Sequence, residues 1–396
     1  MKKATLILIS ILLALFAFTA CNNSIDYIID DQPTDPKKLP LTLEFIDSGK
    51  FWVKYYDYDY NLVEYSINGG ERAPLNNNEE ITVSVGDKIC FYRDVDGARS
   101  IAYHVNIKCD SECYVYGNVM SLFKSENFDE LYSVPVESLM GLFYENTNIR
   151  NHDEIDLVLP ATELAEGCYK YMFYGCTGLT RAPELPATTL AVGCYYGMFY
   201  GCTGLTVAPE LPAKTLTDWC YISMFQGCTG LTTVPEELPA TTLANYCYYC
   251  MFEDCTSLTT APVLPATSLS ESCYAYMFSG CTSLETAPEE LPATTLAYDC
   301  YDSMFYGCTS LEIAPVLPAE TLANYCYNWM FRGCSSLTSI TCLAIDISAD
   351  SCTNEWVYGV PTGFEMGTFT CHHRAGLWNY GINGIPDGWN VIEEAT

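Results

Sequence analysis

This chain contains 22 cysteines among 396 residues, and cysteine can form disulfides, bind metals or act as a nucleophile. Seven pairs have members eight positions apart: Cys168–Cys176, Cys194–Cys202, Cys220–Cys228, Cys247–Cys255, Cys273–Cys281, Cys300–Cys308 and Cys326–Cys334. Both members are present in these seven units, and both are absent from a similar stretch at 140–149. Two independent core positions would sometimes lose one member, so the joint pattern favours a disulfide within each unit. The alternative is that the thiols stay reduced and pack as small apolar side chains.

The other reactive side chains form no recognisable catalytic or metal-binding arrangement. His372 and His373 are adjacent, and in a strand they would point to opposite faces, so we expect no shared metal. The cysteine pairs lack the Cys-x-x-Cys spacing of zinc sites. The sequence has no Gly-x-Ser-x-Gly, His-Glu-x-x-His or phosphate-loop motif. Acidic residues such as Glu184 and Glu210 recur from unit to unit and indicate a solvated face. We therefore expect neither an enzyme nor a cofactor.

The elements that would position these side chains repeat along the chain. Similar units begin at Cys168, Cys194, Cys220, Cys247, Cys273, Cys300 and Cys326, a step of 26 or 27 residues. Such a period is typical of a solenoid, in which each unit contacts only its neighbours. Within one unit we expect a tight helical turn at 168–173 with Met172 and Phe173 in the core, and a short parallel strand at 179–182.

The unit resembles the BspA-like leucine-rich repeats of bacterial surface proteins. The residues that carry the resemblance are Phe173, Cys176, Leu179, Ala182, Leu185 and Pro186, and their counterparts in later units. The resemblance covers 119–358 and implies a right-handed leucine-rich-repeat solenoid, mixed but rich in β-structure. One departure is a proline inside each expected strand, beginning with Pro183 and Pro209. Because proline removes a ladder donor, we expect these strands to be short.

The N-terminal segment predicts an exported, lipid-anchored protein. Residues 1–20 combine Lys2 and Lys3 with an apolar run, as signal peptides do. Cys21 follows a small residue and resembles the lipidated cysteine of a bacterial lipoprotein, so we expect membrane contact through a lipid anchor only. Residues 21–40 read as a tether. The flanking regions resemble members of the Bacteroides type, which implies an outer-membrane lipoprotein exposed on the cell surface.

Composition and pattern set the remaining expectations for domains and partners. The net charge of −31 repels nucleic acid, so no nucleic-acid partner is expected. Residues 41–118 contain short alternating strands and predict a small β-sandwich, which resembles the immunoglobulin-like module placed before such repeats. Residues 359–396 depart from the period and are predicted to be a C-terminal cap.

Positions that vary between units should face outwards, because core positions repeat strictly. Candidate ligand-binding residues there are Tyr171, Tyr174, Tyr196, Tyr200, Tyr249, Tyr276, Tyr306 and Trp329. The alternative is that these rings only shield each turn from its neighbour. The invariant tyrosine that follows each first cysteine, as at Tyr169, is expected to be structural.

The resemblance implies a non-catalytic surface protein that adheres to host extracellular or cell-surface proteins, or to other bacteria. Two alternatives remain open at this point. One is a glycan-binding accessory of a carbohydrate-uptake system, and the other is a structural component of a surface assembly.

Overall fold

The computed structural model describes residues 35–55, 63–94, 105–373 and 378–394. The chain divides into two units, 1–34 and 35–396. The predicted leader, Cys21 and most of the predicted tether therefore lie outside the described residues. No helix in the described residues is long and apolar enough to cross a lipid bilayer.

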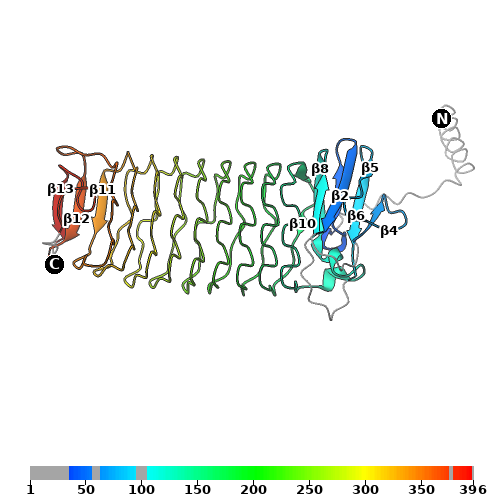
Figure 1. The fold of residues 1–396 in the computed structure, drawn as a ribbon, viewed down its shortest axis with the longest axis horizontal. Helices are drawn as coiled ribbons and strands as arrows, with labels where there is room; N and C mark the ends of the chain where they lie inside the picture. The colour runs from blue at the N-terminus through cyan, green and yellow to red at the C-terminus, as the bar shows by residue number, and fades with distance from the viewer. Residues whose placement is uncertain (1–34, 56–62, 95–104, 374–377, 395–396) are drawn as a thin grey trace, which may run out of the picture. The chain divides into compact units, whose positions relative to one another are not determined.

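The first described strands form two sheets around one core, and β1 to β8 pair antiparallel within them (Figure 1). One sheet has the order β10-β8-β1-β6-β3-β4, with β9 also pairing with β8, and the other has the order β5-β2-β7. The strands are β1 (Thr42–Phe45), β2 (Gly49–Tyr55), β3 (Glu64–Ile67), β4 (Ala73–Pro74), β5 (Ile81–Val83), β6 (Lys88–Tyr92), β7 (Val105–Cys109) and β8 (Cys113–Asn118). The ring of Phe51 in the second sheet lies 6.3 Å from Phe45 and 5.8 Å from Phe91 in the first. Alternating apolar residues thus place one face of each sheet in a shared core.

The first sheet continues directly into the repeats. Strand β8 pairs in parallel with β9 (Ile149–Asn151) and β10 (Leu157–Val158). Three 3₁₀ helices accompany this region, η1 (Pro36–Lys38), η2 (Val119–Leu122) and η3 (Phe128–Glu130). Asn146 occupies the position of the missing second cysteine, and its amide donates to Ile107 O of β7 at 3.1 Å. The Asn146 side chain therefore connects the first coil to β7, at the position where the following coils have a cysteine thiol.

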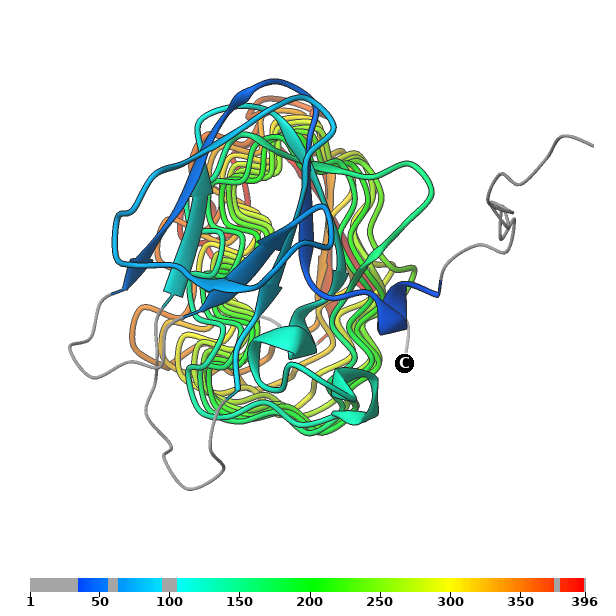
Figure 2. The same ribbon diagram turned by 90° about the vertical axis from the view of Figure 1, so that its right-hand side faces the viewer.

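From here the chain forms a stack of coils. We name each coil by its first cysteine. The coils lie side by side in Figure 1 and superpose when viewed end-on in Figure 2. Backbone amides link each coil to the next. In the Cys168 coil the donors are Gly167, Tyr169, Tyr171, Phe173 and Gly175, with N···O distances of 2.7–3.0 Å.

The segment 168–173 is not the tight helical turn that the sequence predicted. Every second amide donates to the following coil, and the amides between them close local turns, as when Lys170 N donates to Gly167 O at 3.1 Å. Left-handed φ values recur at every fourth residue, at +59° for Gly167, +55° for Tyr171 and +68° for Gly175. A residue in this conformation ends a right-handed helix, so stacking between coils replaces helical hydrogen bonding.

Two columns of stacked aromatic rings run through the core of the repeats. The first contains Tyr169, Tyr195, Tyr221, Tyr248, Tyr274, Tyr301 and Tyr327, with successive ring centroids 5.6–6.0 Å apart. The second contains Phe143, Phe173, Phe199, Phe225, Phe252, Phe278, Phe305 and Phe331, at 5.4–5.8 Å. All of these rings are buried. The structural role predicted for the invariant tyrosine, and the core positions of Met172 and Phe173, are confirmed.

The prolines shorten the strands as the sequence predicted. In the coils that carry the internal proline, pairing is reduced to isolated parallel bridges two residues before it, such as Arg181 with Val207 and Thr260 with Thr286. A longer strand, β11 (Ser339–Cys342), forms where Thr341 replaces the proline. The longest strand of the repeats thus forms where the proline is missing and where β12 (Thr368–His372) supplies a partner strand.

The fourteen paired cysteines are free, buried thiols, not the disulfides that their joint presence favoured. Each second cysteine donates to the phenylalanine carbonyl of the preceding coil, as Cys176 Sγ does to Phe143 O at 3.0 Å; the seven distances are 3.0–3.2 Å. First cysteines instead face the following coil, as Cys220 Sγ does toward Cys247 O. The two members of a pair belong to separate columns with different partners. The open alternative, stacked reduced thiols, is the arrangement that the structure has.

The C-terminal residues continue the pairing between coils. Val357 N donates to Ile382 O at 3.3 Å and Gly363 N to Asp387 O at 2.8 Å. Strand β12 (Thr368–His372) pairs in parallel with β11 and with β13 (Asn390–Glu394). Among the described strands β13 ends this sheet, and all five of its residues are exposed. The segment predicted to be a cap thus presents an open strand edge.

Candidate functional site

The paired cysteines of the coils are buried thiols that are poorly suited to nucleophilic chemistry. Burial raises the pKa of Cys168 and of Cys228 to about 12, so both stay protonated at neutral pH. His372 and His373 have ring centroids 4.2 Å apart, so the expectation that they point to opposite faces was wrong at this strand end. Across the described ranges, however, no three His, Cys, Asp or Glu side chains are grouped as a metal site. Exposed aromatic side chains on the coils are the other candidates for a functional surface.

Several of the predicted tyrosines lie together on the turn side of the first coils. The ring of Tyr174 stacks between Tyr144 at 4.6 Å and Tyr200 at 4.7 Å. Tyr171 meets Tyr174 edge-on at 5.7 Å and Tyr196 at 5.1 Å. All five rings are partly buried. The predicted residues Tyr171, Tyr174, Tyr196 and Tyr200 thus form one continuous aromatic surface here, and the rings also shield one another.

The remaining predicted residues are separated from this surface. Tyr249 contacts Tyr276 at 5.6 Å two coils further along. Tyr306 is exposed, and Trp329 lies beneath the guanidinium of Arg332 at 5.2 Å. Some neighbouring positions expected to face outwards are buried, including Asp302 and Asn328. The predicted ligand-binding residues therefore lie in separate patches and not on one continuous surface.

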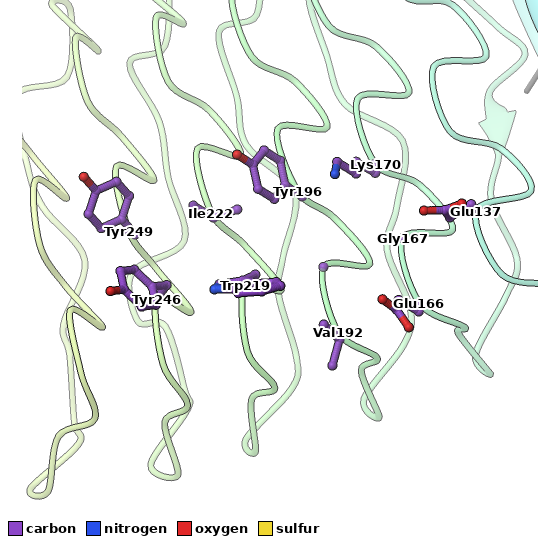
Figure 3. A pocket seen from close by; sticks show the side chains of 11 residues that line it. Glu137, Glu166, Gly167, Lys170, Val192, Tyr196, Trp219, Ile222, Tyr246 and Tyr249 are labelled. Atoms are coloured by element: carbon purple, nitrogen blue, oxygen red, sulfur yellow. The ribbon is translucent and has the colours of Figure 1, made fainter. Parts of the chain in front are cut away.

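A pocket of about 430 Å³ lies on the turn side of the first coils, and we call it the aromatic pocket (Figure 3). It is lined by Glu137, Glu166, Gly167, Lys170, Val192, Gly193, Tyr196, Trp219, Ile222, Tyr246 and Tyr249. Figure 3 shows two rows of side chains that cross successive coils. Lys170, Tyr196, Ile222 and Tyr249 form one row, and Glu166, Val192, Trp219 and Tyr246 form the other. Tyr196 and Tyr249 are the predicted residues that this pocket brings together.

The hollow exists because glycine precedes the first cysteine in two coils where later coils carry large rings. That position holds Gly167 and Gly193, and then Trp219 and Tyr246. A Cβ added at Gly193 would meet no atom within 4 Å, so the space above it is open. All four residues have a left-handed φ, between +55° and +61°. The backbone has the same conformation in all four coils, so the side chain alone decides whether this position leaves open space or is filled by an aromatic ring.

Sequence reasoning missed Trp219 and Tyr246. Trp219 is 49% exposed, which is large for an indole ring. The signal was available, since the position before the first cysteine also varies between units. The prediction used only the two positions after the invariant tyrosine and the one after the phenylalanine. Which ring faces which gap depends on the stacking of the coils.

The pocket combines aromatic rings with charges of both signs. Glu137 and Glu166 line one end, and the Lys170 ammonium lies 4.7 Å from the centre of the Tyr196 ring. Beside the pocket, the Tyr246 hydroxyl donates to a Glu271 carboxylate oxygen at 3.1 Å. Burial raises the pKa of Tyr249, so this phenol is neutral at physiological pH. The pocket can therefore offer aromatic faces, phenol groups and carboxylates to a ligand.

A second hollow, of about 650 Å³, lies between η1, β10 and the strand side of the Cys168 coil. Its lining combines proline and aliphatic side chains with charged ones, and Arg181 there is already paired with Asp156 at 2.9 Å and with His152 O at 2.7 Å. It has no cluster of aromatic rings, since Tyr132 is the single aromatic residue among the described residues that line it.

Comparison with known families places the repeats. The family model for the BspA type leucine-rich repeat region matches residues 166–288, 197–328 and 251–352. Neither the curated proteins nor the solved structures gave a match. Leucine-rich repeats generally serve as non-catalytic scaffolds that bind other proteins. Residues 166–352 of this chain are therefore similar to the BspA type leucine-rich repeat region.

Proposed function

We propose that this protein is a non-catalytic cell-surface lipoprotein that uses its stacked repeats to adhere to other proteins. In this proposal the coils form a right-handed solenoid, and residues 41–118 are an immunoglobulin-like sandwich that carries it. The acyl chains on Cys21 hold the protein in the outer membrane, and the repeats contact host extracellular or cell-surface proteins, or the surface of other bacteria.

The observation that carries the proposal is the aromatic pocket. Tyr196, Trp219, Tyr246 and Tyr249 come from three successive coils and line one hollow. Tyrosine and tryptophan dominate the binding energy of protein interfaces, because they bury a large area at a small cost in side-chain entropy. The half-exposed Trp219 is the residue most suited to enter a partner's surface.

The binding part of the proposal is tested with an array of host matrix proteins, host cell-surface proteins and glycans, probed with the full mature chain. We expect binding to at least one protein and a loss of more than about tenfold in affinity for the Trp219→Ala, Tyr246→Ala double variant. Tyr298→Ala is the matched control, because Tyr298 is 50% exposed and does not line the pocket. Equal losses in both variants, or no protein ligand, would overturn the assignment.

The anchoring part needs a separate measurement, since the array does not report it. Mass spectrometry of the protein from its own membranes should show acyl chains on Cys21, and protease added to intact cells should cleave the protein. A Cys21→Ser variant should be released from the membrane. An unmodified Cys21 in the membrane-bound protein would remove lipid anchoring from the proposal.

A second candidate, a structural component of a surface assembly, is favoured by the open edge of β13. This strand exposes apolar side chains at Val391 (42%) and Ile392 (52%), and such edges pair readily with other chains. If this is the main function, light scattering should show concentration-dependent assembly that Ile392→Lys abolishes. A protein that stays monomeric at high concentration would exclude it. The remaining alternative, glycan binding, is an outcome of the array.

A further inference from the structure

The aromatic pocket already holds one cation of its own. The Lys170 ammonium lies 4.7 Å from the centroid of Tyr196 and 5.5 Å from that of Tyr171. Both distances lie within the range of cation–π attraction, in which the negative face of a ring stabilises a positive charge. The half of the pocket around Trp219 and Tyr246 has the same kind of lining but no cationic side chain among its lining residues.

The charges around the pocket favour a positive ligand. Glu137 and Glu166 line it, and Glu271 lies beside it through its contact with Tyr246. Lys170 is the single cationic residue among those that line the pocket, all of which belong to the described part of the chain. The whole chain carries a net charge of −31, which attracts cations and repels anions during approach.

The polar groups of the pocket suit a cation better than a neutral sugar. Its lining contains no asparagine or glutamine, the side chains whose amides both donate to and accept from sugar hydroxyls. It supplies carboxylates and ring faces, which recognise ammonium and guanidinium groups through charge and cation–π attraction.

We infer that the aromatic pocket binds an extended segment of a partner protein through lysine or arginine side chains, seated on Trp219 and Tyr246 and neutralised by Glu166. This inference rests on the proposed function, because it names the chemistry of the partner at the same site. The two rows of side chains cross the coils, so the segment lies along the stack and meets one coil after another. Lys170 repels such a segment and so limits its affinity.

The test uses a fluorescent eight-residue glycine–serine peptide that carries three lysines, with its three-fold acetyl-lysine form as the matched neutral probe. Anisotropy with the full mature chain at an ionic strength of about 0.15 M reports the affinity. Acetylation should lower the affinity more than about tenfold, and Lys170→Met should raise it about three- to tenfold by removing one like charge. Glu166→Gln should lower it by a similar factor.

A chain of such negative charge attracts any polycation, so the decisive variant is one that changes no charge. Trp219→Ala should lower the affinity for the lysine peptide more than about tenfold, whereas Tyr298→Ala should change it less than about twofold. Equal affinities of wild type and Trp219→Ala would show only non-specific attraction and overturn the inference.

The remaining outcomes separate this inference from the proposed function. If a partner found on the array depends on Trp219, but acetylation and Lys170→Met leave peptide binding unchanged, protein binding stands and the cationic ligand is refuted. If a neutral oligosaccharide binds in a Trp219-dependent manner and the lysine peptide does not, the site is a glycan site and both proposals fall.

Discussion

The column of tyrosines predicts that one ring in the middle of the stack holds the neighbouring coils together. Tyr221 is 1% exposed and stacks on Tyr195 at 5.7 Å and on Tyr248 at 5.6 Å, with interplanar angles of 1° and 9°. A buried aromatic side chain removes roughly 150–250 Å² from water, which contributes about 4–6 kcal/mol at about 25 cal/mol per Å². Because alanine keeps one carbon and the cavity partly relaxes, Tyr221→Ala should lower the free energy of unfolding by about 3–5 kcal/mol.

Urea unfolding followed by circular dichroism measures this loss, and amide hydrogen exchange locates it. Each coil bonds only to its neighbours, so protection should fall in the Cys194, Cys220 and Cys247 coils while β1–β8 keep theirs. Tyr298→Ala, at an exposed ring, should change the free energy of unfolding by less than about 0.5 kcal/mol. A loss below about 1 kcal/mol for Tyr221→Ala, or a uniform loss of protection, would refute the role assigned to the column.

Three further perturbations follow from individual contacts. Tyr169→Phe should raise the free energy of unfolding by about 1 kcal/mol in urea titrations, because its buried hydroxyl has no hydrogen-bond partner among the described residues; a loss would contradict this. Gly197→Ala should lower it by about 1–3 kcal/mol, since the glycine has φ +56° and a Cβ would lie 2.5 Å from the Tyr171 ring; an unchanged midpoint would disprove the clash. Burial raises the pKa of Asp302 to about 7 from 3.8, so the folded state keeps a proton that the unfolded chain releases. The stability from that proton is complete below about pH 4 and lost as the pH rises to about 7. The melting temperature should therefore fall over this window more steeply in the wild type than in Asp302→Asn. Equal slopes in the two proteins would exclude the effect.

The residues that form the core of the repeats could be predicted from the repeating pattern of the sequence. Met172, Phe173 and Tyr169 recur without exception, and residues that recur in every unit of a stack must face a neighbour that also recurs. Proline at Pro183 and its counterparts removes a specific donor, so the weak strands could also be predicted. The helical turn could not be excluded in this way, because the left-handed φ at Tyr171 depends on hydrogen bonds to the next coil.

The partner of each thiol was not available from the pattern of cysteines. Joint presence of Cys168 and Cys176 shows only that the two positions are coupled. The structure couples them through the coils on either side, since Cys176 donates backwards to Phe143 O and the first cysteines of later coils face forwards. A correlation within a unit can therefore reflect contacts between units.

What the sequence determined by itself is the repeat, because a fixed period of buried side chains has few ways to satisfy its core other than stacking. Only the tertiary structure decided where that stack is hollow. Gly193 and Trp219 are 26 positions apart in the sequence. When the coils stack, the ring of Trp219 forms a wall of the open space above Gly193. A binding pocket on a stack of repeats is made from the differences between neighbouring coils, and such differences acquire a shape only when the register of the coils is known.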